Sequence, residues 1–184
     1  YGFVGPNGCG KSVFFKTLCG YSLLTEGQVI YRGKIIGKEQ DFIDDAGIVI
    51  EEPEFINSLS GLENLKILAE IQKKISEAEI IEVLKQFDLY EDRNKKVGKY
   101  SVGMKQKLRL AQAVMEKPQV LILDEPMNGL DKKSVKKVED ILKAFVENGG
   151  TLLMTSHIEQ QVEACCKIVY EIDGGEILRV TVLQ

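Results

Sequence analysis

Eight residues near the start of the chain, Gly-Pro-Asn-Gly-Cys-Gly-Lys-Ser at positions 5–12, have the types and spacing needed to hold a phosphate group. They match the P-loop pattern G-x-x-x-x-G-K-[ST], in which glycines let backbone N–H groups approach an anion closely. The lysine adds positive charge for the terminal phosphates, and the serine hydroxyl offers Mg²⁺ an oxygen ligand. The predicted phosphate-binding residues are Gly5, Pro6, Asn7, Gly8, Cys9, Gly10, Lys11, Ser12 and Val13.

Three polar side chains that follow apolar runs could complete a site for phosphate chemistry. Asp124 and Glu125 come directly after the apolar residues 120–123, and His157, the one histidine, follows the run 151–155. Open α/β sheets bind ligands at the carboxyl ends of their strands, so we expect all three beside the P-loop. Asp124 would hold Mg²⁺ through water, and Glu125 would orient or deprotonate an attacking water, worth roughly 10² to 10⁴-fold in rate. A lone histidine is more often structural, but this position favours contact with the terminal phosphate.

The periodicity of apolar residues predicts the elements that position these side chains. Short apolar runs at residues 1–4, 47–50, 120–123 and 151–155 are typical of buried strands in a parallel sheet. A helix beginning near residue 13 and an amphipathic helix over residues 131–147 would flank that sheet. Residues 27–37 predict a short β-hairpin, and residues 167–182 a second one. The predicted fold class is α/β, a P-loop nucleoside-triphosphatase core with a mostly parallel sheet between helices.

Three consecutive helices between residues 58 and 116 indicate an inserted α-helical subdomain. Capping boxes begin the first two, Ser60 with Glu63 and Ser76 with Glu79, and Ser101 can cap the third. We therefore expect one domain over residues 1–184. Residues 1–57 and 117–184 would form its catalytic core, and residues 58–116 the helical subdomain.

Composition limits the function classes. The 184 residues carry a net charge of −4, which gives no electrostatic reason to expect a nucleic-acid partner. No apolar run approaches the roughly 20 residues of a membrane span. The four cysteines lack zinc-site spacing, which favours a reduced, cytosolic protein. Because the chain begins with Tyr1, four residues before the P-loop, we expect the natural N-terminus to be missing.

Further motifs accompany the P-loop in a fixed order. Residues 100–107 read Tyr-Ser-Val-Gly-Met-Lys-Gln-Lys, residues 120–126 are an apolar run ending in Asp-Glu-Pro, and residues 128–131 read Asn-Gly-Leu-Asp. Together with His157, these resemble the signature motif, the Walker B strand, the D-loop and the switch histidine of the ATP-binding subunits of ABC transporters. The resemblance covers almost the whole chain, and the signature motif separates this family from other P-loop enzymes.

The resemblance implies an enzyme that binds and hydrolyses ATP with Mg²⁺, using Glu125 and His157 as catalytic residues. Two copies would close head to tail, each completing the ATP site of the other through a helix N-terminus. A separate transmembrane permease subunit would form the pore. The chain would then be cytoplasmic, held peripherally on the cytoplasmic face of the membrane by that permease. The residues implied in the contact with the second copy are Ser101, Gly103 and Gln106 of the signature motif and Asp131 of the D-loop.

Three features depart from the family pattern. Val102 stands where the signature motif usually has glycine, and Glu51 stands where the Q-loop has glutamine. A glutamate keeps the oxygen but adds negative charge beside a polyphosphate, which is tolerated most easily with a cation between them. The predicted metal ligands are therefore Ser12, Asp124 and Glu51. The aromatic residue that stacks on adenine is absent, so the sequence does not identify the adenine contacts.

The residues of these motifs are similar to those of exporter ATPases associated with bacteriocins, lantibiotic immunity and multidrug efflux. One of the similar stretches is Glu-Pro-Glu-Phe at residues 52–55. The resemblance implies that residues 51–62 would help form the groove that receives a helix of the permease. A non-transport ABC ATPase of the translation or DNA-repair type is the alternative, but neither a tandem copy nor a coiled-coil insertion is visible. A nucleotide-gated regulatory subunit without hydrolysis is disfavoured because both Glu125 and His157 are present.

Overall fold

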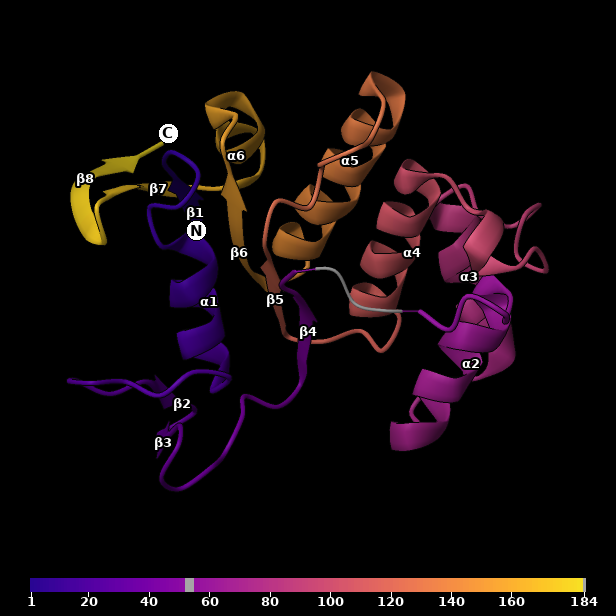
Figure 1. Cartoon of the computed structure of the whole chain (residues 1–184), viewed down its shortest axis with the longest axis horizontal. Coiled ribbons are helices and arrows are strands. Elements are labelled where there is room, and N and C mark those ends of the chain that lie inside the picture. Colours follow the sequence, from indigo (N-terminus) through magenta and orange to yellow (C-terminus); the bar gives the residue numbers. More distant parts are fainter. Residues whose placement is uncertain (52–54, 184) are drawn as a thin grey trace.

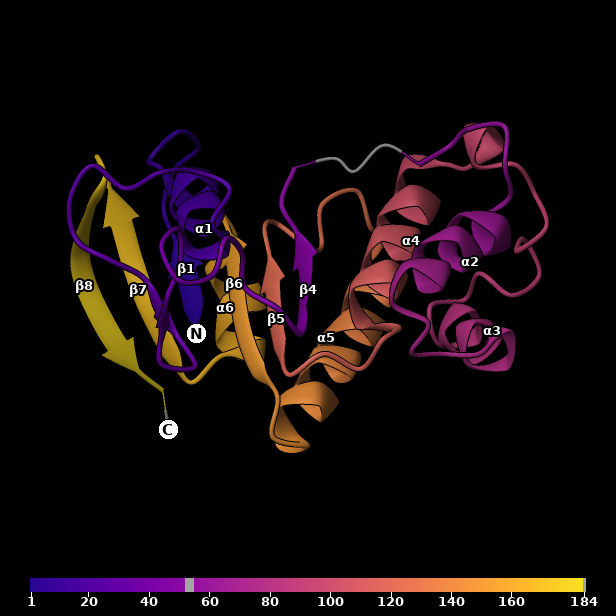
Figure 2. The same cartoon turned by 90° about the horizontal axis from the view of Figure 1, so that it is seen from below.

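A six-stranded sheet forms the centre of the protein in a computed structural model that describes residues 1–51 and 55–183. The strand order is β4-β5-β6-β1-β7-β8, with every neighbouring pair parallel except β7 and β8, which form an antiparallel hairpin. Figure 2 shows this order from β8 on one side to β4 on the other. The predicted α/β class with a mostly parallel sheet is confirmed. The strands are β1 (Gly2–Val4), β4 (Ala46–Val49), β5 (Val120–Leu123), β6 (Thr151–Ser156), β7 (Ile168–Asp173) and β8 (Glu176–Val182).

The central strands are apolar throughout because both faces of the sheet are covered. Side chains alternate along a strand, so Leu121 and Leu123 of β5 face one side and Ile122 faces the other. Leu121 and Leu123 belong to the core cluster that contains Leu142, whereas Ile122 packs in a second cluster with Phe15. The helices that cover these faces are α1 (Lys11–Cys19), α5 (Lys132–Glu147) and α6 (Glu159–Cys165).

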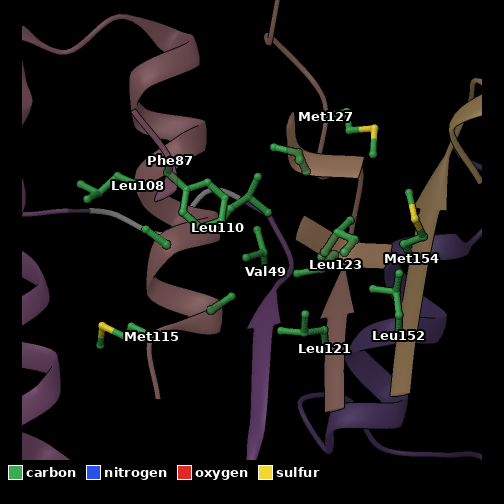
Figure 3. Packing of buried hydrophobic residues seen from close by; sticks show 14 of the residues in the cluster. Val49, Phe87, Leu108, Leu110, Met115, Leu121, Leu123, Met127, Leu152 and Met154 are labelled. Carbon is green, nitrogen blue, oxygen red and sulfur yellow. The ribbon is translucent and has the colours of Figure 1, made fainter. Parts of the chain in front are cut away.

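The helices of residues 58–116 lie beyond β4 (Figures 1 and 2). Both predicted capping boxes are present, with Ser60 capping the first helix and Ser76 the second, and Ser101 caps the third. The third helix packs against the sheet, and Figure 3 shows its residue Leu110 beside Val49 of β4. The elements are α2 (Gly61–Gln72), α3 (Glu77–Gln86), the 3₁₀ turn Val97–Lys99 and α4 (Val102–Val114). These bounds agree with the expected run of helices, and the division into subdomains stays a prediction.

Two smaller elements complete the chain. The predicted hairpin near the N-terminus is the two-stranded sheet of β2 (Ile30–Tyr31) and β3 (Lys34–Ile35). Helix α6 was not expected, because its seven residues bury only Val162 and Cys165, too few for a periodic pattern. It lies so close to β1 that a Cβ on Gly2 would stand 1.8 Å from Cγ1 of Val162.

Among the described residues, no helix has both the length and the apolar character needed to span a membrane.

The close packing of α4 on β4 predicts the effect of adding one methyl group. A Cβ on Gly47 would lie 1.9 Å from the carbonyl oxygen of Ala113 and 2.7 Å from Cδ2 of Leu121. Because a backbone atom cannot move aside cheaply, we expect Gly47→Ala to lower the free energy of unfolding by about 1–3 kcal/mol. Urea unfolding monitored by circular dichroism measures this loss.

Gly98→Ala is the matched control, because a Cβ there would meet its nearest neighbour, the carbonyl oxygen of Asn57, at 3.1 Å. We expect this variant to lose less stability than Gly47→Ala. Equal stability of Gly47→Ala and the unmodified protein would contradict the close approach of α4 to β4.

Candidate functional site

The P-loop connects β1 to the N-terminus of α1. Gly10 is the N-cap of α1 with φ 106°, and Gly8 has φ 82°, conformations that favour glycine. A glycine cap has no side chain, so the first-turn N–H groups and the positive end of the helix dipole stay available to an anion. The buried ammonium group of Lys11 donates to the carbonyl oxygens of Gly5, at 2.8 Å, and Pro6, at 3.1 Å. The sequence therefore folds locally into a glycine-rich turn at a helix N-terminus, as the P-loop pattern predicts.

Six of the nine predicted phosphate-binding residues meet Asp124 and Glu125 at one open cavity of about 190 Å³, whereas Gly5, Pro6 and Cys9 do not line it. It lies where β1 and β5 end, at the carboxyl edge of the parallel sheet, and brings together residues more than a hundred positions apart in the sequence. The sheet order explains this meeting, because parallel strands present their carboxyl ends on one side. The lining residues are Asn7, Gly8, Gly10, Lys11, Ser12, Val13, Asp124 and Glu125.

Asp124 is held by two hydroxyl groups from two different elements. The Ser12 hydroxyl of α1 donates to Oδ2 at 2.5 Å, and the Thr155 hydroxyl of β6 donates to Oδ1 at 2.6 Å. A carboxylate beside a serine hydroxyl is an all-oxygen donor set, which is the set that Mg²⁺ prefers. The residues present therefore fit the metal implied by the motifs.

Glu125 and His157 are in direct contact. Nδ1 of His157 lies 2.9 Å from Oε2 of Glu125, and it donates to that oxygen in the tautomer that carries the proton on Nδ1. The other oxygen, Oε1, is buried and has no hydrogen-bond partner within the described part of the chain. Because carboxylate oxygens are strong acceptors, this atom can accept a hydrogen bond from a water molecule beside the cavity. The expected approach of His157 to the catalytic edge is present, through Glu125.

Two predicted residues, Cys9 and Glu51, do not line the cavity. The side chain of Cys9 is 6% exposed and packs with Phe3 and Phe15, so it points into the core and away from the cavity. Glu51 does not line the cavity; its carboxylate forms an ion pair with Lys16 of α1, and its side chain is 65% exposed. A motif identifies positions, but the direction of each side chain depends on packing.

Gln106 of the signature motif is buried in its own chain. Its side chain is 5% exposed, and its amide nitrogen donates to the carbonyl oxygen of Pro126 at 2.8 Å. The bond joins α4 to the segment that follows Glu125, a contact that no local pattern in the sequence would reveal. The contact of Gln106 with a nucleotide held by a second copy stays a prediction.

Ser101, Gly103 and Asp131 lie at two adjacent helix N-termini. The Ser101 hydroxyl accepts from the backbone N–H of Met104, and Asp131 accepts from that of Ser134, a hydrogen bond that lowers the pKa of Asp131. A Cβ on Gly103 would lie 3.0 Å from the carbonyl oxygen of Gly129, so the start of α4 packs closely on the D-loop. These three residues are outside the set of described residues that lines the cavity.

A parallel sheet with a P-loop after its β1 strand and acidic residues after β5 defines the class of P-loop nucleotide-binding domains. Residues 1–128 match the family model described as ABC transporter. The chain is 37% identical over 177 residues to the uncharacterized ABC transporter ATP-binding protein YybJ of Bacillus subtilis, covering 96% of this chain and 81% of that protein. The chain therefore belongs to the ABC transporter family.

Two further similarities come from a relative and a solved structure. The chain is 34% identical to the lantibiotic transport ATP-binding protein SrtF of Streptococcus pyogenes, covering 97% of this chain and 76% of SrtF. The dimeric post-hydrolysis structure of the ATP-binding cassette MJ0796, bound to ADP and Pi, has the same fold, with a TM-score of 0.87 and 24% identity over 100% of this chain and 84% of that one. Against two other Bacillus subtilis relatives, YhcH and YdbJ, the chain spans 59% and 60% of their length. Residues 52–54, which belong to the Glu-Pro-Glu-Phe stretch shared with exporter ATPases, are outside the described residues.

The buried thiols allow a test of the packing behind the P-loop. All four cysteines are buried, and burial raises the pKa of Cys19 and of Cys165 to about 12. With such a pKa, about one thiol in ten thousand is ionised at pH 8, and the thiolate is the reactive form. We therefore expect maleimide to label native protein slowly at Cys19 and Cys165, and labelling to accelerate as the pH rises.

Protein unfolded in urea is the control, since its exposed thiols ionise near their ordinary pKa and react quickly. Mass spectrometry of tryptic peptides assigns the labelled sites. Labelling of native Cys19 as fast as in urea would contradict its position in the core beside Phe15.

Proposed function

We propose that this chain is the ATP-binding and hydrolysing subunit of an ABC transporter. The observation that carries the proposal is the cavity where the P-loop residues Lys11 and Ser12 meet Asp124 and Glu125, with His157 bonded to Glu125. Such an arrangement serves phosphoryl transfer to water, in which positioning and charge stabilisation supply most of the catalysis. The substrate is ATP.

Each group has a distinct role in this proposal. The P-loop N–H groups and Lys11 bind the phosphates, and Ser12 and Asp124 hold Mg²⁺, which supplies charge neutralisation at the phosphate oxygens when bound. Glu125 orients the attacking water through Oε1 and can take its proton. His157 fixes the Glu125 carboxylate through Oε2 and contacts the γ-phosphate.

Glu51 remains a candidate metal ligand. Its ion pair with Lys16 keeps the carboxylate on α1, the helix that begins at the P-loop. An exposed ion pair stabilises little, typically less than about 1 kcal/mol, so exchange of Lys16 for a metal-bound water costs little. We therefore retain Glu51 as a ligand that reaches the metal through water, with Lys16 as its competing partner.

The partners follow from the positions of the signature motif and from the relatives. Ser101 and Gly103 lie outside the cavity of their own chain, so in a two-fold ATP dimer they would contact the nucleotide held by the second copy. A separate permease would carry the solute and hold this chain at the cytoplasmic face of the membrane. SrtF is named for lantibiotic transport and another relative, BcrA of Bacillus licheniformis, for bacitracin transport, which supports export of peptides or drugs.

Glu125→Gln tests hydrolysis. The amide keeps the shape of the carboxylate but cannot take a proton from water, so we expect turnover of MgATP to fall by about 10² to 10⁴-fold while ATP still binds. A phosphate-release assay on the full-length protein with its permease measures this. Glu147→Gln, at the exposed end of α5, is the matched control and should keep turnover unchanged. Full turnover in Glu125→Gln would remove Glu125 from the catalytic role.

Ser101→Arg tests the dimer. In the Glu125→Gln background, which retains ATP, we expect sedimentation to show a dimer with ATP and a monomer without it. An arginine at position 101 would place a bulky cation where the second nucleotide must approach, so the dimer should be lost. Ser58→Arg, which also replaces an exposed serine, is the control and should leave the dimer intact. A dimer that persists in Ser101→Arg would contradict the proposed contact.

A further inference from the structure

We propose that Thr155 is a positioning residue that sets the two acidic side chains at the end of β5, a role that rests on the proposed function above. Thr155 lies in β6 and has an exposed fraction of 0%. Its hydroxyl oxygen accepts from the backbone N–H of Glu125 at 2.9 Å and donates to Oδ1 of Asp124 at 2.6 Å. One buried hydroxyl thus bonds to both acidic residues, using its donor and its acceptor capacity at once.

Strand register holds Thr155 at this point. β6 pairs with β5 on one side, Met154 opposite Leu123, and with β1 on the other, Thr155 opposite Phe3. Thr155 therefore lies in a strand held between β5, which ends one residue before Asp124, and β1, which leads into the P-loop. A group on a strand that is paired with a neighbour on each side can orient another side chain more accurately than a group on a loop can.

The bond to Asp124 orients its carboxylate. With Oδ1 held by Thr155, Oδ2 is directed to Ser12, so the two oxygens have different partners. Hydrogen bonds to a charged acceptor are roughly twice as strong as neutral ones, and this one is buried at its donor end. Without it the carboxylate can rotate about its terminal torsion, and the oxygen set that fits Mg²⁺ is no longer fixed.

The bond from Glu125 supports an unfavourable backbone conformation. Glu125 has φ 48°, in the left-handed region that residues other than glycine adopt at a cost. Its N–H is satisfied by the Thr155 hydroxyl, which fixes the peptide plane between Asp124 and Glu125. That plane determines where the Glu125 side chain leaves the backbone, and hence where Oε1 and the His157 contact lie.

Thr155→Val is the direct test, because valine keeps the branched shape and removes only the hydroxyl. In the full-length protein we expect the Mg²⁺ concentration at half-saturation of fluorescent ATP-analogue binding to rise about tenfold or more, with binding in EDTA unchanged. We also expect faster hydrogen exchange of the Glu125 amide, followed by NMR, and a fall in kcat with KM unchanged at saturating Mg²⁺. A purely structural role would lower stability without moving the Mg²⁺ midpoint.

Two further variants keep the test decisive. Thr155→Ser retains the hydroxyl and should restore the Mg²⁺ midpoint to within about threefold, whereas Thr151→Val, at the exposed start of the same strand, should match the unmodified protein. A wild-type Mg²⁺ midpoint and a protected Glu125 amide in Thr155→Val would overturn the proposal, as would failure of serine to restore either. Absence of Mg²⁺-dependent ATP binding in the unmodified protein would overturn the proposed function, and the Glu125 exchange arm would still decide the role of Thr155.

Discussion

The Asp124 carboxylate is the point on which the rest of the site depends. It accepts from Ser12 at the start of α1 and from Thr155 in β6, and Asp124 itself directly follows β5, so one side chain connects three elements that are distant in the sequence. A carboxylate at the edge of an apolar sheet is costly unless its oxygens are paired. The parallel order of the sheet makes that pairing possible, because the strands deliver their polar ends to the same edge.

The helical region is connected to this edge through backbone and side-chain contacts. α4 packs on β4 at Gly47, and Gln106 of the same helix donates to Pro126, one residue beyond Glu125. An ion pair between Lys137 of α5 and Asp88, just after α3, adds a second link on the surface. A displacement of α4 would therefore be transmitted to the segment that carries Glu125, since a buried hydrogen bond and close backbone packing resist separate movement.

The side-chain directions of three motif residues have one physical cause. Cys9, Glu51 and Gln106 all occupy motif positions, yet each side chain is directed by its neighbours: Cys9 into an aromatic cluster, Glu51 onto a lysine, and Gln106 onto a carbonyl. Motif spacing specifies the backbone position of a residue. The choice between core, partner side chain and open cavity is made by packing and by the need to satisfy polar groups.

The sequence by itself determined the features that depend on residues close to one another along the chain. Glycine spacing predicted the P-loop, capping boxes predicted where α2 and α3 begin, and uninterrupted apolar runs predicted β4, β5 and β6, because each depends on residues that are close along the chain. The tertiary structure alone decided what depends on distant residues. Helix α6 is positioned by its contact with Gly2, and Thr155 meets Asp124 and Glu125 only because the register of β5 and β6 places a hydroxyl across from them. Strand order and register follow from the packing of the whole chain, so no local pattern could have revealed that the hydroxyl of a buried threonine joins both acids.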